Sequence, residues 1–149
     1  MRQILAAVDF SPVSKAVIEQ AASLAEAFAA ELTLVYVATP DPEFVGYAVG
    51  PQSVRDDHAR EFRDQHRSLQ AIAEGLRDRA ITARALLIQG STAEKILAEG
   101  ARLRADAIVI GSHGHGALYR ALLGSVSEAV VRAAQCPVLV VPAAHSSDA

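Results

Sequence analysis

The segment that decides the fold reads GSHGHGALYRALLGSVSEAV and runs from Gly111 to Val130. It follows the apolar run AIVI and ends in apolar residues at helical spacing, so a glycine-rich loop joins a predicted strand to a predicted helix. Such a loop suits phosphate groups, because glycines admit close backbone approach and positive φ, and the helix adds unpaired N–H donors and its dipole. The spacing is specific: two residues separate Gly111 from Gly114, nine separate Gly114 from Gly124, and Ser125 follows.

Short apolar runs alternate with longer amphipathic segments along the whole chain. This alternation is typical of βα units, and it predicts an α/β fold in which helices cover both faces of a parallel sheet. The five expected strands are Gln3–Val8, Glu31–Val37, Ala83–Ile88, Ala107–Ile110 and Pro137–Val141. Four helices are expected between them.

Capping residues and apolar spacing predict where the helices begin and which face they bury. The first helix is expected to have Ser11 as N-cap and Pro12 at its first position. Two S-x-x-E capping boxes are expected to open the third and fourth helices: Ser91 with Glu94, and Ser125 with Glu128. The expected core-facing residues are Val13, Val17, Ala21, Leu24 and Phe28 in the first helix, and Phe62, Leu69, Ile72, Leu76 and Ala80 in the second.

One long connection interrupts this tight pattern, from Thr39 to Ser53. It holds three prolines and two glycines, and it is either a lid or a surface excursion without function.

Length and composition limit the classes of protein that this sequence can encode. A chain of 149 residues is expected to form one domain over residues 1–149. A net charge of −3 provides no basic field, so we expect no nucleic-acid partner. The lone Cys136 cannot form an intramolecular disulfide, and no apolar run reaches the ~20 residues of a membrane span. We therefore expect a cytoplasmic protein with no membrane partner.

Other known phosphate-binding and catalytic motifs do not match this sequence. A P-loop needs a lysine before its final serine, where Gly124 stands, and the dinucleotide fingerprint would follow the first strand. No nucleophile elbow is present, and His113 has no clustered metal-ligating neighbours. No catalytic residue and no protein-built metal site is predicted. Simpler interpretations stay open: a tight connection at Gly111 and Gly114, helix capping by Ser125, and capping of the first helix by Asp9.

In motif and order these residues resemble the universal stress protein family, over nearly the whole chain. The ATP-binding branch of that family carries G-x2-G-x9-G-[ST], which Gly111, Gly114, Gly124 and Ser125 match. Further matches are Asp9 after the first strand, Gly90 after the third, and the final strand CPVLVV over residues 136–141.

The resemblance implies a Rossmann-like open sheet of five parallel strands in the order 3-2-1-4-5, with a ligand at the carboxyl ends of the strands. Adenine would contact Asp9 and the backbone of Val37, with Ile110 and Gly111 beside the nucleoside. The phosphates would meet backbone donors, with Mg²⁺ bridging their oxygens. The residues expected at the phosphates are His113, Gly114, Gly124, Ser125 and Val126.

The resemblance implies an ATP-binding protein with a regulatory role in a stress response and at most slow ATP hydrolysis. Two alternatives remain: a nucleotide hydrolase or transferase on the same fold, and a ligand-free stress protein that acts through protein contacts. A homodimer is expected through the last strand, Pro137–Val141, because an apolar edge strand is stabilised by pairing with its two-fold mate, as in relatives of this family.

Overall fold

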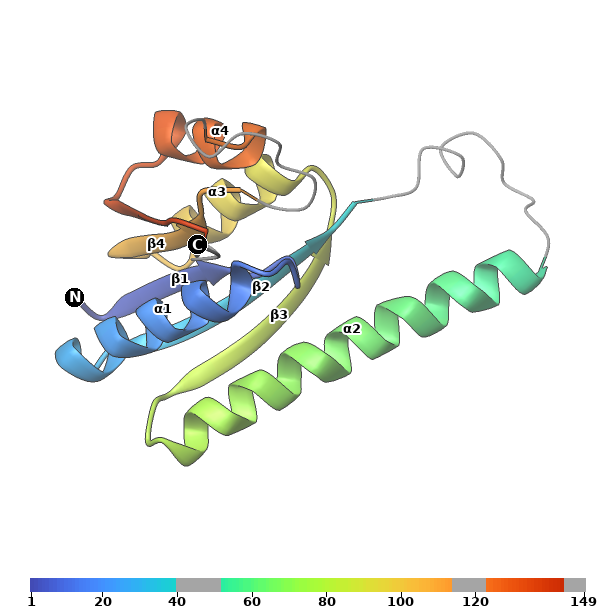
Figure 1. The fold of residues 1–149 in the computed structure, drawn as a ribbon, viewed down its shortest axis with the longest axis horizontal. Coiled ribbons are helices and arrows are strands. Elements are labelled where there is room, and N and C mark those ends of the chain that lie inside the picture. Colours follow the sequence, from blue (N-terminus) through green and yellow to red (C-terminus); the bar gives the residue numbers. More distant parts are fainter. Residues whose placement is uncertain (40–51, 114–122, 144–149) are drawn as a thin grey trace, which may run out of the picture.

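The computed structural model describes residues 1–39, 52–113 and 123–143, in which strands and helices alternate as expected (Figure 1). The strands are β1 (Gln3–Ala7), β2 (Glu31–Ala38), β3 (Ala83–Gln89), β4 (Ala107–Gly111) and β5 (Val138–Val141). The helices are α1 (Ser14–Phe28), α2 (Gln52–Asp78), α3 (Thr92–Arg102) and α4 (Ser125–Ala133). Each strand differs from its expected range by one residue at one end.

All five strands are parallel, and their order is β3-β2-β1-β4-β5. This order confirms the prediction. The central strand β1 pairs with β2 on one side and with β4 on the other, where Ala6 lies opposite Val109. From β1 the chain adds β2 and β3 on one side of the sheet and then β4 and β5 on the other, so the strand order reverses between β1 and β4. In sheets of this kind a crevice forms beyond the carboxyl ends of the strands at this point.

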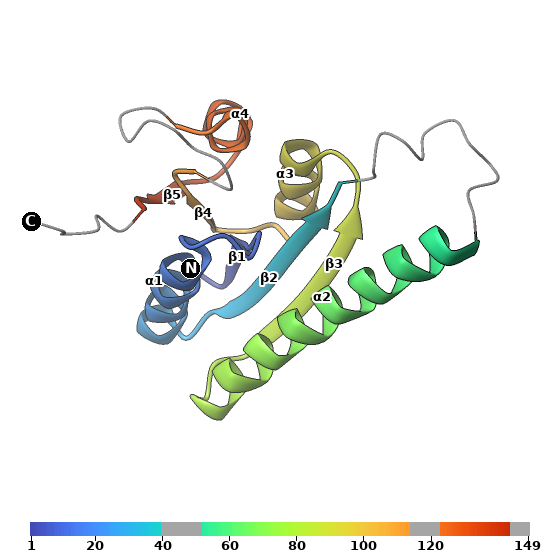
Figure 2. The same ribbon diagram turned by 45° about the vertical axis from the view of Figure 1, so that its right-hand side comes forward.

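Two helices cover each face of the sheet (Figure 2). The core between the sheet and α1 and α2 includes Val17 and Leu69, whereas Ile96 and Val130 belong to the core beneath α3 and α4. Alternate residues of β2 point into the two cores, as the two-residue period of a strand requires. Leu32 and Leu34 face α1 and α2, and Val35 and Val37 face α3 and α4.

The start of α1 differs from the prediction. The helix begins at Ser14, with Val13 as the N-cap, instead of being capped by Ser11. The reason is a hydrogen-bonded turn before the helix. In this turn the Asp9 carboxylate accepts a hydrogen bond from the N–H of Ser11, and the carbonyl of Ser11 accepts one from the N–H of Ser14. The buried face of α1 is also shifted toward small residues, namely Ala21, Ala22 and Ala25, and Phe28 is 51% exposed.

Neither predicted capping box forms. Ser91 is the N-cap of α3 but makes no side-chain cap hydrogen bond, and the N-cap of α4 is Gly124 instead of Ser125. The Glu128 carboxylate, which a capping box would turn back to the helix start, instead pairs with Arg132 at 2.8 Å. The first turn of α4 is therefore left without a side-chain cap.

Helix α2 begins earlier than expected, since Ser53 lies within it and not in the preceding connection. Residues 40–51, which hold most of the long connection expected from Thr39 to Ser53, lie outside the described part of the chain, so both interpretations of it stay open. The C-terminal half of α2 packs on the sheet through Leu69, Ala73 and Leu76, while its N-terminal half extends past the sheet (Figure 1). Ala80, expected in the core, is exposed and follows α2 with φ of 62°.

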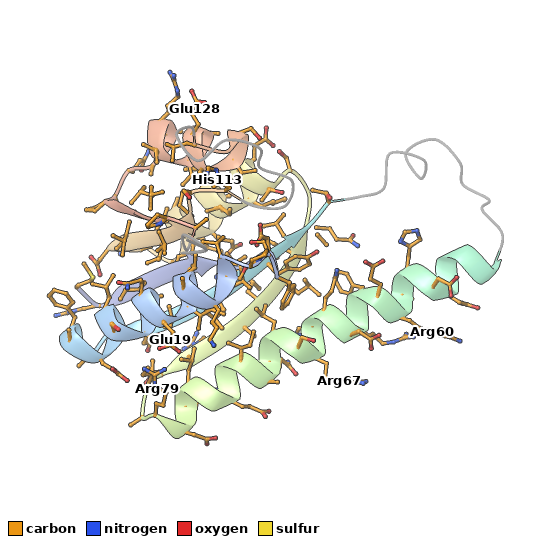
Figure 3. The ribbon with its side chains drawn as sticks, in the orientation of Figure 1. Glu19, Arg60, Arg67, Arg79, His113 and Glu128 are labelled. Carbon is orange, nitrogen blue, oxygen red and sulfur yellow. The ribbon has the colours of Figure 1, made fainter. Side chains whose placement is uncertain are left out.

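Charged side chains join the end of α2 to α1. Arg79 donates to Glu19 at 3.2 Å and to Glu26 at 3.1 Å, and Figure 3 shows Arg79 beside Glu19. Over the described ranges, no helix is long and apolar enough to cross a membrane.

Candidate functional site

A cavity of about 580 Å³ lies beyond the carboxyl ends of β1, β2 and β4, next to the first turns of α3 and α4. Eight of the nine predicted site residues line it, and they come from four separate parts of the chain. These eight are Asp9, Val37, Ile110, Gly111, His113, Gly124, Ser125 and Val126. The ninth, Gly114, lies outside the described residues. The fold thus brings the predicted residues together at the expected edge of the sheet.

The Asp9 carboxylate stands at the end of β1 and shapes the turn into α1. Its Oδ1 accepts hydrogen bonds from the N–H of Ser11 and from the hydroxyl of Ser14, both at 2.9 Å. The N–H of Asp9 in turn donates to Oγ of Ser14 at 3.3 Å. These hydrogen bonds join Asp9 to the turn before α1 and to the Ser14 hydroxyl, and the N-cap of the helix is Val13, so Asp9 stabilises the turn and also lines the cavity.

Gly111 and Gly124, the two glycines of the segment that the structure describes, do not have a positive φ. Gly124 has φ of −63° and ψ of 159°, which other residues adopt readily. Among the described glycines only Gly90, at the end of β3, has a positive φ, of 145°. Positive φ is therefore not the reason for a glycine at position 111 or 124, whereas a Cβ at Gly111 would lie 2.6 Å from Cγ1 of Val13.

The first turn of α4 is tied to the end of β4 by two hydrogen bonds. The N–H of Gly124 donates to the carbonyl of Ser112 at 2.8 Å, and the buried hydroxyl of Ser127 donates to the carbonyl of Gly111 at 2.6 Å. Ser125 and Val126 remain exposed at the cavity. Because the first N–H groups of a helix have no acceptor within it, this uncapped turn presents donors and a positive dipole end to the cavity.

Among the described residues, the ionisable side chains on the cavity wall are those of Asp9, Tyr36 and His113; His113 lies below α4 in Figure 3. Burial raises the pKa of Tyr36, as do the negative charges of Glu61 and Asp9, while a hydrogen bond from Gln65 lowers it. Tyr36 is therefore a neutral phenol at pH 7. Within residues 1–39, 52–113 and 123–143, no three His, Cys, Asp or Glu side chains form a group able to hold a metal ion.

Several lining residues were not predicted from the sequence: Ser14, Tyr36, Thr39, Thr92 and Ser127. Each lies within two residues of the carboxyl end of a strand or in the first turn of a helix that follows one, so the rule that places ligands at that end of the sheet could have found them. Tyr36 also contacts Phe10, with ring centroids 5.1 Å apart, and its hydroxyl accepts a hydrogen bond from Gln65 of α2.

The strand order and the cavity at the point of reversal define an α/β protein of the Rossmann-like class. A family model described as the universal stress protein family matches residues 1–142, and the chain belongs to that family.

Known relatives agree in sequence and in fold. A universal stress protein from Thermus aquaticus is 34% identical over 142 residues, which are 94% of this chain and 98% of the relative. The solved structure of hypothetical protein MJ0577 has a TM-score of 0.78 and 25% sequence identity, over 94% of each chain.

Two further solved structures contain nucleotides. A universal stress protein in complex with cAMP has a TM-score of 0.65 at 20% identity, over 96% of this chain and 98% of the other. A universal stress protein from Archaeoglobus fulgidus in complex with dAMP has a TM-score of 0.63 at 21% identity, over 94% of this chain and 97% of the other. At these identities the likeness shows the shared fold, and the nucleotides belong to those proteins.

Proposed function

We propose that this protein binds ATP in the cavity between β1, β2 and β4, as a regulatory component of a cytoplasmic stress response. The observation that carries the proposal is the convergence of eight predicted site residues, distant in sequence, on one cavity wall. The complexes of related proteins with cAMP and dAMP support an adenine nucleotide as the ligand.

The size and polarity of the cavity suit a nucleotide in one orientation. Its volume of about 580 Å³ falls within the range of roughly 300–1,000 Å³ usual for small-molecule sites. The uncapped first turn of α4 offers N–H donors, so the phosphates belong at Gly124, Ser125 and Val126. The Asp9 carboxylate would repel phosphates but can accept from a ribose hydroxyl or a base amine. The nucleoside therefore lies toward Asp9 and Val37.

The cavity wall provides Mg²⁺ with few protein ligands, since Asp9 is its one carboxylate among the described residues. Mg²⁺ retains several waters and is commonly held by phosphates, so we propose that it enters with the nucleotide and is held by the phosphate oxygens.

Hydrolysis is proposed to be slow at most. A general base must reach the attacking water, and His113 is the one imidazole on the described wall of the cavity. Asp9 already accepts two hydrogen bonds on Oδ1 and lies toward the nucleoside. A role as a nucleotide-dependent binding protein, without nucleic-acid partners, fits this wall better than a fast hydrolase or transferase.

A homodimer through β5 is part of the proposal. β5 is an edge strand, and Leu139 exposes 39% of its surface there, whereas Val141 is buried in the core of its own chain. Pairing of two β5 strands across a two-fold axis would satisfy the free backbone groups of the edge and cover Leu139.

Calorimetric titration with ATP and Mg²⁺ tests the site. The wild-type chain is expected to bind one ATP, and Gly124→Val is expected to abolish binding without unfolding the protein, because valine accepts the backbone angles at position 124. Gly75→Ala is the matched control, since a Cβ at Gly75 of α2 meets nothing within 4 Å. Equal affinities in wild type and Gly124→Val would refute the assignment, and no binding by wild type would refute the function.

A further inference from the structure

The turn between β1 and α1, residues 9–14, is held from within by a reciprocal pair of hydrogen bonds. The hydroxyl of Ser14 donates to Oδ1 of Asp9 at 2.9 Å and accepts the N–H of Asp9 at 3.3 Å. Ser14 is only 6% exposed, so its hydroxyl has little access to water as an alternative partner. The Ser14 hydroxyl therefore helps to orient the Asp9 carboxylate, together with the N–H of Ser11, which donates to the same Oδ1 at 2.9 Å.

The same turn is held from outside by its packing on the end of β4. A Cβ built on Gly111 would lie 2.6 Å from Cγ1 of Val13 and 3.2 Å from the carbonyl oxygen of His113. Real Cβ atoms do not approach a carbon atom to 2.6 Å, so a side chain at position 111 would displace Val13 and the turn that carries it. Val13 is 7% exposed and packs in the core, which leaves it little room to move.

The backbone at Gly111 does not itself require glycine. Gly111 is the last residue of β4 and pairs with Val141 of β5, and it is not among the described residues with positive φ. The close approach of Val13 is then the structural reason for a glycine at this position.

We infer that Gly111, Val13 and Ser14 are positioning residues for Asp9, so that the first glycine of the motif serves the nucleoside end of the site and not the phosphates. The inference rests on the proposed function. The two ends of the glycine-rich segment then have different roles, since Gly111 makes room for the turn that orients Asp9, whereas Gly124 opens the first turn of α4 to phosphate.

Affinities for adenosine and for ATP distinguish the two ends of the site, because only ATP carries phosphates and contacts the phosphate end. Gly111→Ala is expected to weaken both ligands by the same factor, at least about tenfold. Ser14→Ala is also expected to weaken both by about tenfold, the usual worth of a hydrogen bond to a charged group. A variant at the phosphate end, such as Gly124→Val, should lose ATP while adenosine still binds.

Shortening Val13, whose Cγ1 atom a Cβ at position 111 would meet, tests whether Gly111 acts through Val13. The double variant Val13→Ala/Gly111→Ala lacks both Cγ atoms of Val13 and keeps only the 3.2 Å approach to the His113 carbonyl oxygen, so its affinities for adenosine and ATP are expected to exceed those of Gly111→Ala by at least about threefold. No recovery in the double variant would overturn the inference, as would a Gly111→Ala protein that loses ATP but keeps adenosine.

A double-mutant cycle of Ser14 and Asp9 tests the role of Ser14 even if Gly111→Ala does not fold. If Ser14 acts through Asp9, then Ser14→Ala should have no further effect on adenosine affinity in an Asp9→Ala background. Additive losses in the two variants would show that Ser14 acts independently and would overturn the inference. A folded wild-type protein that binds neither ligand would instead refute the proposed function.

Discussion

The link between Ser127 and Gly111 is the most informative single contact to remove. Ser127 is 5% exposed, and its hydroxyl donates to the Gly111 carbonyl at 2.6 Å, which joins the first turn of α4 to the end of β4. Ser127→Ala leaves that carbonyl without this donor in a buried place, at a cost of about 1–2 kcal/mol. For a domain of this length the loss corresponds to a fall in Tm of roughly 2–8 °C.

Urea unfolding followed by circular dichroism measures this loss, and calorimetry with ATP measures its effect on the site. ATP affinity is expected to fall together with stability, because the donors of the first turn of α4 are no longer fixed relative to β4. Ser125→Ala is the control in the same turn: Ser125 is exposed, so stability should stay within about 0.5 kcal/mol and ATP affinity within about tenfold. The reasoning is refuted if both variants lose the same stability, or if Ser127→Ala loses less than about 0.5 kcal/mol.

Three further predictions follow from packing, charge and the sheet edge. Leu69→Ala, at a fully buried position of α2, should lower the free energy of unfolding by about 2–5 kcal/mol, whereas Phe28→Ala, at a residue 51% exposed, should change it little; equal urea midpoints for the two variants would contradict this packing. The N–H groups of Arg2 and Gln3 donate to Asp106 and hold the pKa of its carboxyl below the ordinary 3.8, so its contribution to stability is complete above pH 3.8 and is lost as the pH falls through the lower folded-state pKa. Asp106→Asn should therefore be less stable than wild type at pH 7, and the gap should close in acid; a gap of constant size from pH 7 to pH 2 would argue against it. Leu139→Lys should yield a monomer of 15.7 kDa by light scattering where wild type has twice that mass, and a monomeric wild type would refute the dimer.

The apolar pattern of the sequence predicts the individual strands, because the apolar runs are short and clearly separated. The strands differ from prediction by single residues, and the order β3-β2-β1-β4-β5 was reached through the family resemblance, since periodicity carries no information on which strands are neighbours. The order then brought Asp9 and Gly111, about a hundred residues apart, to one cavity.

Ser91 is the N-cap of α3 as predicted, but the predicted N-caps of α1 and α4 and both capping boxes were wrong, because these predictions treated each helix as an isolated segment. Ser11 has a residue type suited to an N-cap, but its N–H is bound by Asp9 and the helix begins three residues later. Glu128 pairs with Arg132 instead of closing a capping box. Such competition between local partners is decided by tertiary geometry, which is also why the collision of a Cβ at Gly111 with Val13 was invisible in the spacing of the glycines.

An NMR titration of the isotope-labelled protein with ATP and Mg²⁺ reports both whether the nucleotide binds and which residues it contacts. The largest amide shift changes are expected at Gly111, His113, Gly124 and Val126, and the amino ends of the strands, around Asp106, are expected to stay unchanged. Absence of shift changes at saturating ATP, or changes centred on those amino ends, would contradict the proposed site.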